Sequence, residues 1–187
     1  MRSAADFTPY DPSQAEAARL LRALQQELEA RETRRATGLL GSLSARFSSP
    51  RRPVTGLYLW GGVGRGNTYL LDWFVEEMPL PGKERAHFHH FMRDVHDELS
   101  RLPRQPDPLD VLAARRCRDL RVLCLDEFIV TDITDAMLLF GLLRAYFARG
   151  VTLVTTSNTR PDELYRNGLQ RQLFLPAIDL LKTHTRS

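Results

Sequence analysis

A glycine-rich segment at residues 61–68, Gly-Gly-Val-Gly-Arg-Gly-Asn-Thr, has the spacing of a loop that binds phosphate groups. The glycines of such a loop let successive backbone N–H groups point at phosphate oxygens, and the N-terminus of the following helix adds positive potential. Thr68 stands where a hydroxyl group ligates Mg²⁺. The sequence therefore predicts a site for ATP and Mg²⁺, with the nucleotide bound by Gly61, Gly62, Val63, Gly64, Arg65, Gly66, Asn67, Thr68 and Tyr69.

Asn67 occupies the position at which such a loop has a lysine that reaches the β- and γ-phosphates. Asparagine is shorter and neutral, so it donates a hydrogen bond without balancing phosphate charge. A charged hydrogen bond contributes about 1.5–3 kcal/mol, and we therefore expect nucleotide affinity to be about 10- to 100-fold lower than with lysine. Lys83 and Lys182 are the only lysines. A replacement cation would be an arginine, and we expect Arg65, the nearest one, to point away from the phosphates.

Two adjacent carboxylates follow the apolar segment 121–125. In a nucleotide hydrolase with a phosphate-binding loop, the first carboxylate holds Mg²⁺ and the second can act as a general base toward the attacking water. Asp126 and Glu127 match these two roles. The pair alone is also common as a helix cap or a solvated turn, but it lies about 60 residues after the glycine loop, a separation that favours the functional interpretation. The predicted metal ligands are Thr68 and Asp126.

Two further residues are candidates for the chemistry. Asn158 follows the apolar segment 151–156 and could orient the hydrolytic water, or it could simply begin a turn before Pro161. Arg171 could reach the nucleotide of a neighbouring subunit as an arginine finger, which would require a homo-oligomer. Alternatively, Arg171 is simply a surface arginine on an amphipathic helix.

The elements that must position these residues alternate between strands and helices. Strands are expected at residues 54–60, 85–91, 121–125 and 151–156, and helices at 69–78, 92–102, from 107 onward, 132–149 and near the C-terminus. Strand, glycine loop and helix in that order is the context that the phosphate loop requires. The alternation predicts an α/β fold in which a parallel sheet carries helices on both faces.

Residues 1–52 look like a helical, arginine-rich extension in front of a core at 53–187. Asp11 and Pro12 begin a helix whose apolar stripe runs to about Ala30. Residues 31–52 contain six arginines and one acid, Glu32. This stretch could face nucleic acid or phosphate, but a solvated helix face and linker is the favoured interpretation.

Composition is ordinary for a globular protein, with 43% hydrophobic and 26% charged residues. No apolar run approaches a membrane span, and residues 1–10 lack the layout of a signal peptide, so a cytoplasmic location is expected. Two cysteines are too few for a disulfide framework, and Cys124 is expected in the core. His87 and His89 would share one strand face as a metal-ligand pair, but structural histidines are the favoured interpretation.

Taken together, these segments resemble the ZapE-type (AFG-like) family of AAA+-related ATPases. The segments that carry the resemblance are Gly56-Leu-Tyr-Leu-Trp-Gly-Gly-Val-Gly-Arg-Gly66, His87-Phe-His-His-Phe-Met92, Val122-Leu-Cys-Leu-Asp-Glu-Phe128, Thr155-Thr-Ser-Asn158 and Gly168-Leu-Gln-Arg171 with Phe174-Leu-Pro-Ala-Ile178. The resemblance implies nucleotide binding at residues 61–68, Mg²⁺ and water activation at Asp126 and Glu127, a sensor role for Asn158 and a finger role for Arg171. It also implies a protein partner, the cell-division ring polymer in bacteria or inner-membrane proteins in mitochondria.

Two departures from the family pattern modify the expectation. Asn67 replaces the family's lysine, and the chain stops at Ser187, where the family continues with more sheet and a helical lid. We therefore expect a P-loop core without that lid, with ATP hydrolysis that is weak or lost. One alternative is an inactive scaffold that serves as a protein-binding module. Another, less favoured, is an ATPase that engages nucleic acid as helicase loaders do.

Overall fold

The computed structural model of the chain describes residues 12–39, 52–61 and 66–187. Five parallel strands form one sheet in the order β2-β3-β4-β1-β5. The strands are β1 (Gly56–Trp60), β2 (Lys83–His87), β3 (Val122–Asp126), β4 (Thr152–Ser157) and β5 (Thr185–Arg186). The helices are α1 (Pro12–Leu39), α2 (Asn67–Glu77), α3 (Phe88–Arg101), α4 (Pro108–Arg116), α5 (Ile133–Ala148) and α6 (Arg171–His184), with a short 3-10 helix η2 (Pro161–Glu163).

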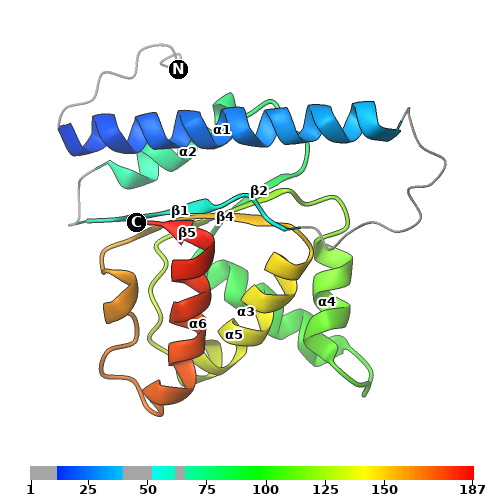
Figure 1. Cartoon of the computed structure of the whole chain (residues 1–187). Helices are drawn as coiled ribbons and strands as arrows, with labels where there is room; N and C mark the ends of the chain where they lie inside the picture. The colour runs from blue at the N-terminus through cyan, green and yellow to red at the C-terminus, as the bar shows by residue number, and fades with distance from the viewer. Residues whose placement is uncertain (1–11, 40–51, 62–65) are drawn as a thin grey trace.

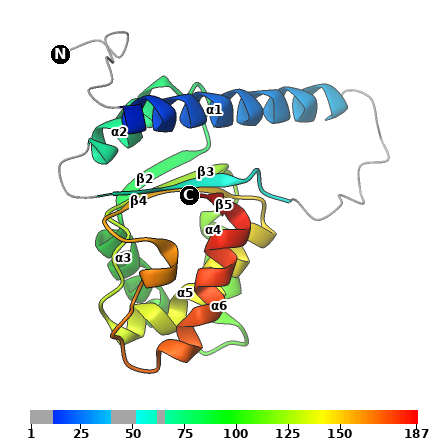
Figure 2. The same cartoon turned by 60° about the vertical axis from the view of Figure 1, so that its left-hand side comes forward.

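The helices cover both faces of the sheet, as the sequence predicts. Helices α1 and α2 lie on one face, whereas α3, α4, α5 and α6 lie on the other (Figures 1 and 2). Side chains of a strand alternate between the faces, so Val122 and Cys124 pack with α1 and α2, and Leu123 and Leu125 pack with the opposite helices. Because both faces are covered, every residue of β3 is buried.

Helix α1 packs on the phosphate-loop helix. Leu21, Leu24 and Leu28 recur at helical spacing and share one hydrophobic cluster with Leu70 and Phe74 of α2. The helix continues to residue 39, beyond the end of the predicted apolar stripe near residue 30, so residues 31–39 of the arginine-rich stretch are helical. Residues 40–51 lie outside the described ranges. The division of the chain at residue 52 stays a prediction.

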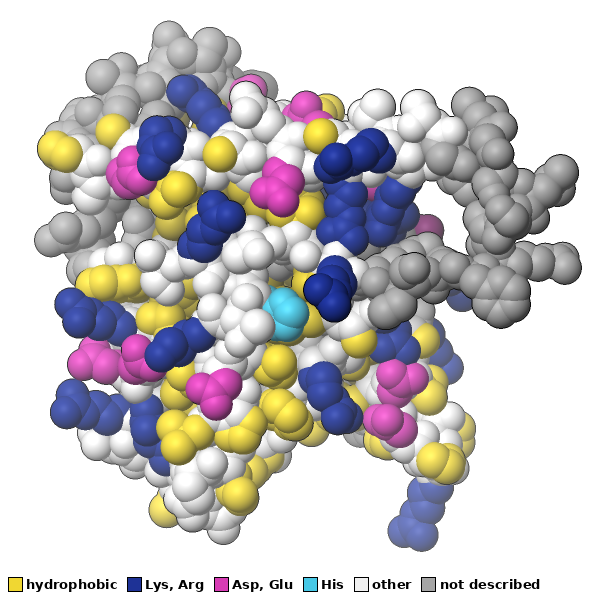
Figure 3. Space-filling model, in the orientation of Figure 1, with side chains coloured by type: hydrophobic (Ala, Val, Ile, Leu, Met, Phe, Trp, Pro, Cys, Tyr) yellow, Lys and Arg dark blue, Asp and Glu magenta, His cyan; other side chains and the backbone are white. Residues whose placement is uncertain are grey.

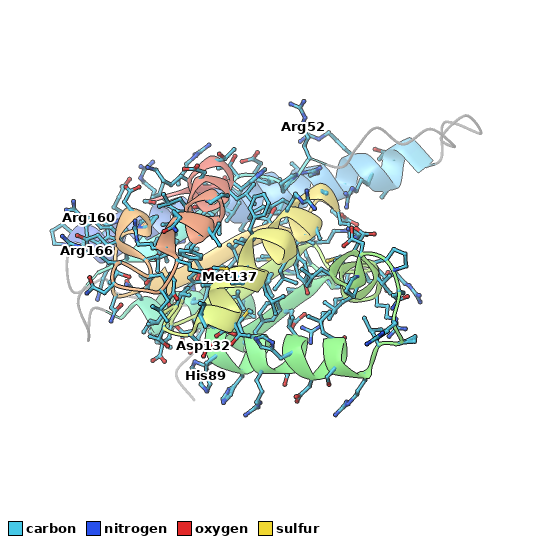
Figure 4. The ribbon with its side chains drawn as sticks, turned by 90° about the horizontal axis from the view of Figure 1, so that it is seen from below. Arg52, His89, Asp132, Met137, Arg160 and Arg166 are labelled. Atoms are coloured by element: carbon cyan, nitrogen blue, oxygen red, sulfur yellow. The ribbon has the colours of Figure 1, made fainter. Side chains whose placement is uncertain are left out.

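The boundary between β2 and α3 lies four residues earlier than expected. Strand β2 ends at His87, and α3 begins at Phe88 rather than at residue 92. Phe88, Phe91 and Val95 are buried at helical spacing, and that packing determines where the helix starts. His89 therefore lies on a helix and not on a strand face with His87. Figure 4 shows it at the periphery of the molecule, and the described residues contain no group of three or more histidine, cysteine, aspartate or glutamate side chains that could hold a metal ion.

None of the helices in the described ranges is both long enough and apolar enough to cross a membrane. Cys124 is buried in the core as expected, and Cys117 is buried as well.

Candidate functional site

The predicted phosphate loop connects β1 to α2 at the carboxyl edge of the sheet. The N–H group of Gly61 donates to the carbonyl oxygen of Ser157 at 3.1 Å, which joins the start of the loop to the end of β4. Gly66 has φ 74°, a left-handed conformation that glycine adopts without strain. Helix α2 starts at the next residue, and its N-cap residue, Gly66, has no side chain that could cap it. Backbone N–H groups at a helix N-terminus attract anions.

Part of this loop lies outside the described residues, namely Gly62, Val63, Gly64 and Arg65. The described part places Asn67 as the first residue of α2, half-buried, and Tyr69 half-exposed two residues later. Between them, the hydroxyl of Thr68 donates to Oδ1 of Asp126 at 3.2 Å. Thr68 belongs to the phosphate-loop helix and Asp126 ends β3, so this contact brings the two predicted metal ligands together.

Asp126 is the most densely bonded side chain of the site, and it is 1% exposed. Its Oδ1 accepts hydrogen bonds from Thr68, from the hydroxyl of Thr156 and, at 3.1 Å, from the N–H group of Glu127. The remaining oxygen, Oδ2, receives Nη2 of Arg85 at 3.2 Å. A buried polar side chain is costly unless it is hydrogen-bonded, and both oxygens of Asp126 have partners.

Arg85 is a member of the site that sequence reasoning missed. Its guanidinium lies between two carboxylates, with Nε 2.5 Å from Oδ1 of Asp72 and Nη2 3.2 Å from Oδ2 of Asp126. Asp72 is on α2, four residues after Thr68 and therefore on the same side of the helix. Arg85 thus ties the phosphate-loop helix to the end of β3 through a strand that neither motif includes.

Glu127 has a strained backbone conformation. Its φ is 53°, in the left-handed region that residues other than glycine rarely occupy. The conformation is held by its N–H group, which donates to Oδ1 of Asp126 and, at 3.0 Å, to the hydroxyl of Thr156. Strain of this kind is concentrated at functional sites. The turn leaves Asp126 buried and exposes the Glu127 side chain, so the two adjacent carboxylates have different environments.

The two remaining candidates lie at different places. Asn158 is exposed directly after β4, at the same edge of the sheet as Gly61 and Asp126. Arg171 begins α6, and its Nη2 donates to the carbonyl oxygen of Asp162 at 2.6 Å. Helix α6 starts at the end of the molecule remote from the sheet (Figures 1 and 2). The structure therefore gathers Asn158 with the carboxylates but not Arg171, whose predicted role in a neighbouring subunit's site stays a prediction.

The centre of this site contains oxygen atoms that could act as metal ligands. The hydroxyl of Thr68 and the carboxylate of Asp126 are the ligand types that Mg²⁺ prefers, and they are in hydrogen-bond contact near the N-terminus of α2. The residues present therefore fit a magnesium ion bound together with a nucleotide.

Comparisons with known proteins show what the chain as a whole is similar to. The family model described as "AFG1-like ATPase" matches residues 3–187. The chain is 52% identical over 180 residues to the cell division protein ZapE of Escherichia coli (strain K12), which covers 93% of this chain and 48% of that protein. It is 41% identical over 150 residues to lactation elevated protein 1 homolog B of Danio rerio, covering 74% of this chain and 30% of that protein. The chain thus spans about half the length, or less, of these curated relatives.

Solved structures share the fold. The structure of DnaI matches with a TM-score of 0.63 at 18% identity, covering 98% of this chain and 84% of that one. The DnaC helicase loader matches with a TM-score of 0.62 at 16% identity, covering 98% of this chain and 93% of that one. At such identities the likeness is one of fold alone.

Proposed function

Because this chain belongs to the AFG1-like ATPase family, we propose that it binds ATP with Mg²⁺ at the carboxyl edge of the sheet and that the site is arranged to hydrolyse ATP to ADP and phosphate. The observation that carries the proposal is the contact between the hydroxyl of Thr68 and the carboxylate of Asp126. It joins the phosphate-loop helix to the strand-end acid, the two parts between which a magnesium nucleotide binds in P-loop enzymes.

The residues of the chain then have distinct roles. Backbone N–H groups of residues 61–69 would hold the phosphates, and Thr68 and Asp126 would hold Mg²⁺, which would supply positive charge to offset that of the phosphates. The exposed carboxylate of Glu127 takes a proton from the water that attacks the γ-phosphorus, and Asn158 orients that water. Arg171 serves the site of a neighbouring copy, which makes a homo-oligomer part of the proposal. We also propose, from the family resemblance, that the ATPase is of the AAA+ type.

Asn67 sets the expected strength of this activity. A neutral side chain at the first position of α2 leaves the γ-phosphate without the cation that the motif provides. We therefore propose weak nucleotide binding and slow hydrolysis. The same substitution supports a second candidate function, a non-catalytic module that uses the P-loop fold to bind another protein.

Calorimetric titration of Mg-ATP separates these candidates. We expect the native chain to bind in the micromolar to millimolar range and the Asn67→Lys variant to bind about 10- to 100-fold more tightly. Asp126→Asn is the control for the magnesium-dependent part of binding, and ADP without Mg²⁺ isolates the contribution of the backbone N–H groups. If neither the native chain nor Asn67→Lys binds at millimolar Mg-ATP, the site is not a nucleotide site and the binding-module function replaces it.

The partner is proposed to be a protein of the cell-division machinery, following the name of the Escherichia coli relative. A cytoplasmic setting, where ATP and Mg²⁺ are both abundant, belongs to this proposal. Recovery of division-ring proteins by the immobilised chain in the presence of Mg-ATP, and their loss with the Asp126→Asn variant, would support it. Equal recovery by both would mean that the partner does not respond to the nucleotide site.

A further inference from the structure

A second charged surface lies at the opposite edge of the sheet, at the amino ends of the strands. It consists of five arginines, Arg31, Arg34 and Arg35 of α1, Arg52 ahead of β1 and Arg121 ahead of β3, which we call the arginine recess. Figure 3 shows basic side chains gathered where the C-terminal half of α1 overlies the sheet. The carboxyl edge with Thr68 and Asp126 is at the other end of the strands, so this surface is separate from the proposed nucleotide site.

The surface is hollowed. A depression of about 430 Å³ is lined by Arg31, Arg34, Arg52, Glu27 and the backbone segment 53–55. Arg31 donates through Nη2 to the carbonyl oxygen of Arg52, which joins α1 to the segment that leads into β1. Arg34 and Arg52 have exposed side chains, and Figure 4 shows Arg52 projecting away from the body of the molecule.

Positive charge is in excess at this recess. Glu32 is shared between two arginines, 3.2 Å from Nη1 of Arg35 and 3.5 Å from Nε of Arg121. Within the described ranges, Arg31, Arg34 and Arg52 have no carboxylate within ion-pair distance. Burial and the charges of Arg35 and Arg34 lower the pKa of Arg31, whereas the charges of Glu27 and Glu32 act in the opposite direction. An anion placed among the guanidinium groups would reduce their mutual repulsion.

The surroundings of the recess favour a phosphate polymer over a protein or a membrane. The large hydrophobic side chains that the described residues expose all lie elsewhere, at Trp60, Tyr69, Ile129, Met137, Leu169, Leu173 and Leu175. Protein interfaces depend on buried aromatic or aliphatic anchors, and membrane-surface helices insert an apolar face. The apolar face of α1 is already buried against α2. Arginine is also the side chain whose planar fork matches phosphate oxygens.

We propose that the arginine recess binds the phosphate backbone of nucleic acid. Among the described residues that line the recess none is aromatic, so the contacts that they offer are electrostatic and directed at phosphates rather than at bases. Three arginines without a carboxylate partner give three phosphate contacts. Each contact on a single strand contributes about −0.7 to the slope of log affinity against log salt, so the slope is about −2 and affinity falls about 20-fold between 50 and 200 mM salt.

The test is fluorescence anisotropy of a labelled 20-nucleotide oligothymidylate with the full chain and no ATP. We expect Arg34→Glu with Arg52→Glu to lower affinity more than about 10-fold at 50 mM salt and to reduce the slope by about 1.4. The matched control, Arg104→Glu with Arg166→Glu, makes the same change in net charge at exposed positions outside the recess and is expected to change affinity less than about threefold.

Two further measurements keep the result interpretable. Arg34→Lys with Arg52→Lys preserves charge, and because either cation neutralises a phosphate, the variant is expected to stay within about threefold of the native affinity. Circular dichroism of each variant checks that the fold is intact. Absence of binding at 50 mM salt, or equal losses in the recess and control variants, overturns the proposal. These readouts do not depend on nucleotide binding at the carboxyl edge, so failure of one proposal leaves the other standing.

Discussion

Replacing Arg85 by glutamine tests how much the bridge between the two carboxylates contributes to stability. Asp126 is 1% exposed and Arg85 is 23% exposed. Removing one partner of a buried ion pair costs about 3–5 kcal/mol. Asp126 retains hydrogen bonds from Thr68, Thr156 and the N–H group of Glu127, and partial exposure of Arg85 lets water replace it. We therefore expect Arg85→Gln to lower the free energy of unfolding by about 1–3 kcal/mol.

The other carboxylate of the bridge provides a matched control. Asp72 is 45% exposed, and an exposed ion pair contributes about 0–1 kcal/mol, so Asp72→Asn should cost less than Arg85→Gln. Arg85→Gln, Asp126→Asn and the variant that combines them form a double-mutant cycle. We expect the coupling energy between Arg85 and Asp126 to be about 1 kcal/mol or more. Urea unfolding, followed by the fluorescence of Trp60 and Trp73, measures all of these values.

The reasoning is refuted if Arg85→Gln costs no more than Asp72→Asn. It is also refuted if Arg85→Gln costs the same, within about 0.5 kcal/mol, whether residue 126 is aspartate or asparagine. Either result would mean that the buried carboxylate is stabilised by its neutral donors alone. Mg²⁺ binding would then be expected to tolerate the loss of Arg85.

Three other outcomes are expected. Glu127→Gly should raise the free energy of unfolding by about 1 kcal/mol, because φ of 53° strains glutamate and not glycine, while abolishing hydrolysis; a loss of stability in urea would contradict this. Burial lowers the pKa of His184 below 6.5, so the folded chain favours the neutral imidazole. The stability that the neutral form contributes above pH 6.5 is lost as pH falls through the folded pKa. The urea midpoint of His184→Gln should therefore vary less between pH 7 and 5 than that of the native chain. Burial raises the pKa of both Cys117 and Cys124 to about 12, so a thiol reagent at pH 8 should react slowly with the native chain and rapidly with both thiols in urea, and fast labelling of the native chain would show that the core opens.

The parts of the site that follow from local sequence could be predicted, because each has its own signature. The glycine spacing with a preceding strand and a following helix predicts the phosphate loop, and an apolar strand that ends in two acids predicts a carboxylate at the same edge. Thr68 and Asp126 are 58 residues apart in sequence, yet their side chains meet in the structure. Parallel strands place all carboxyl ends at one edge, and this general rule is enough to bring them together.

Arg85 could not be predicted, because its role depends on which strand lies beside β3. In the sheet, Arg85 is in register with Cys124 of β3. No local sequence pattern indicates which strand pairs with β3. The early start of α3 has a similar cause. Alternation at residues 85–91 is compatible with a strand, but burial of Phe88 and Phe91 on one side favours the helix. The left-handed turn at Glu127 likewise depends on a long-range partner, because its N–H group donates to the side-chain oxygen of Thr156 in β4 as well as to that of Asp126.

The packing of α1 on α2 has a consequence for how the molecule unfolds. Burying a leucine contributes about 1.5–3 kcal/mol, so the contacts of Leu21, Leu24 and Leu28 with α2 and the sheet contribute an amount comparable with the whole stability of a small domain, about 5–15 kcal/mol. Helix α2, which carries Thr68, cannot lose this cover and keep its position. Backbone amides of α1 and α2 should therefore exchange with solvent as one cooperative unit. The change in composition near residue 52 therefore need not mark the boundary of a cooperative folding unit.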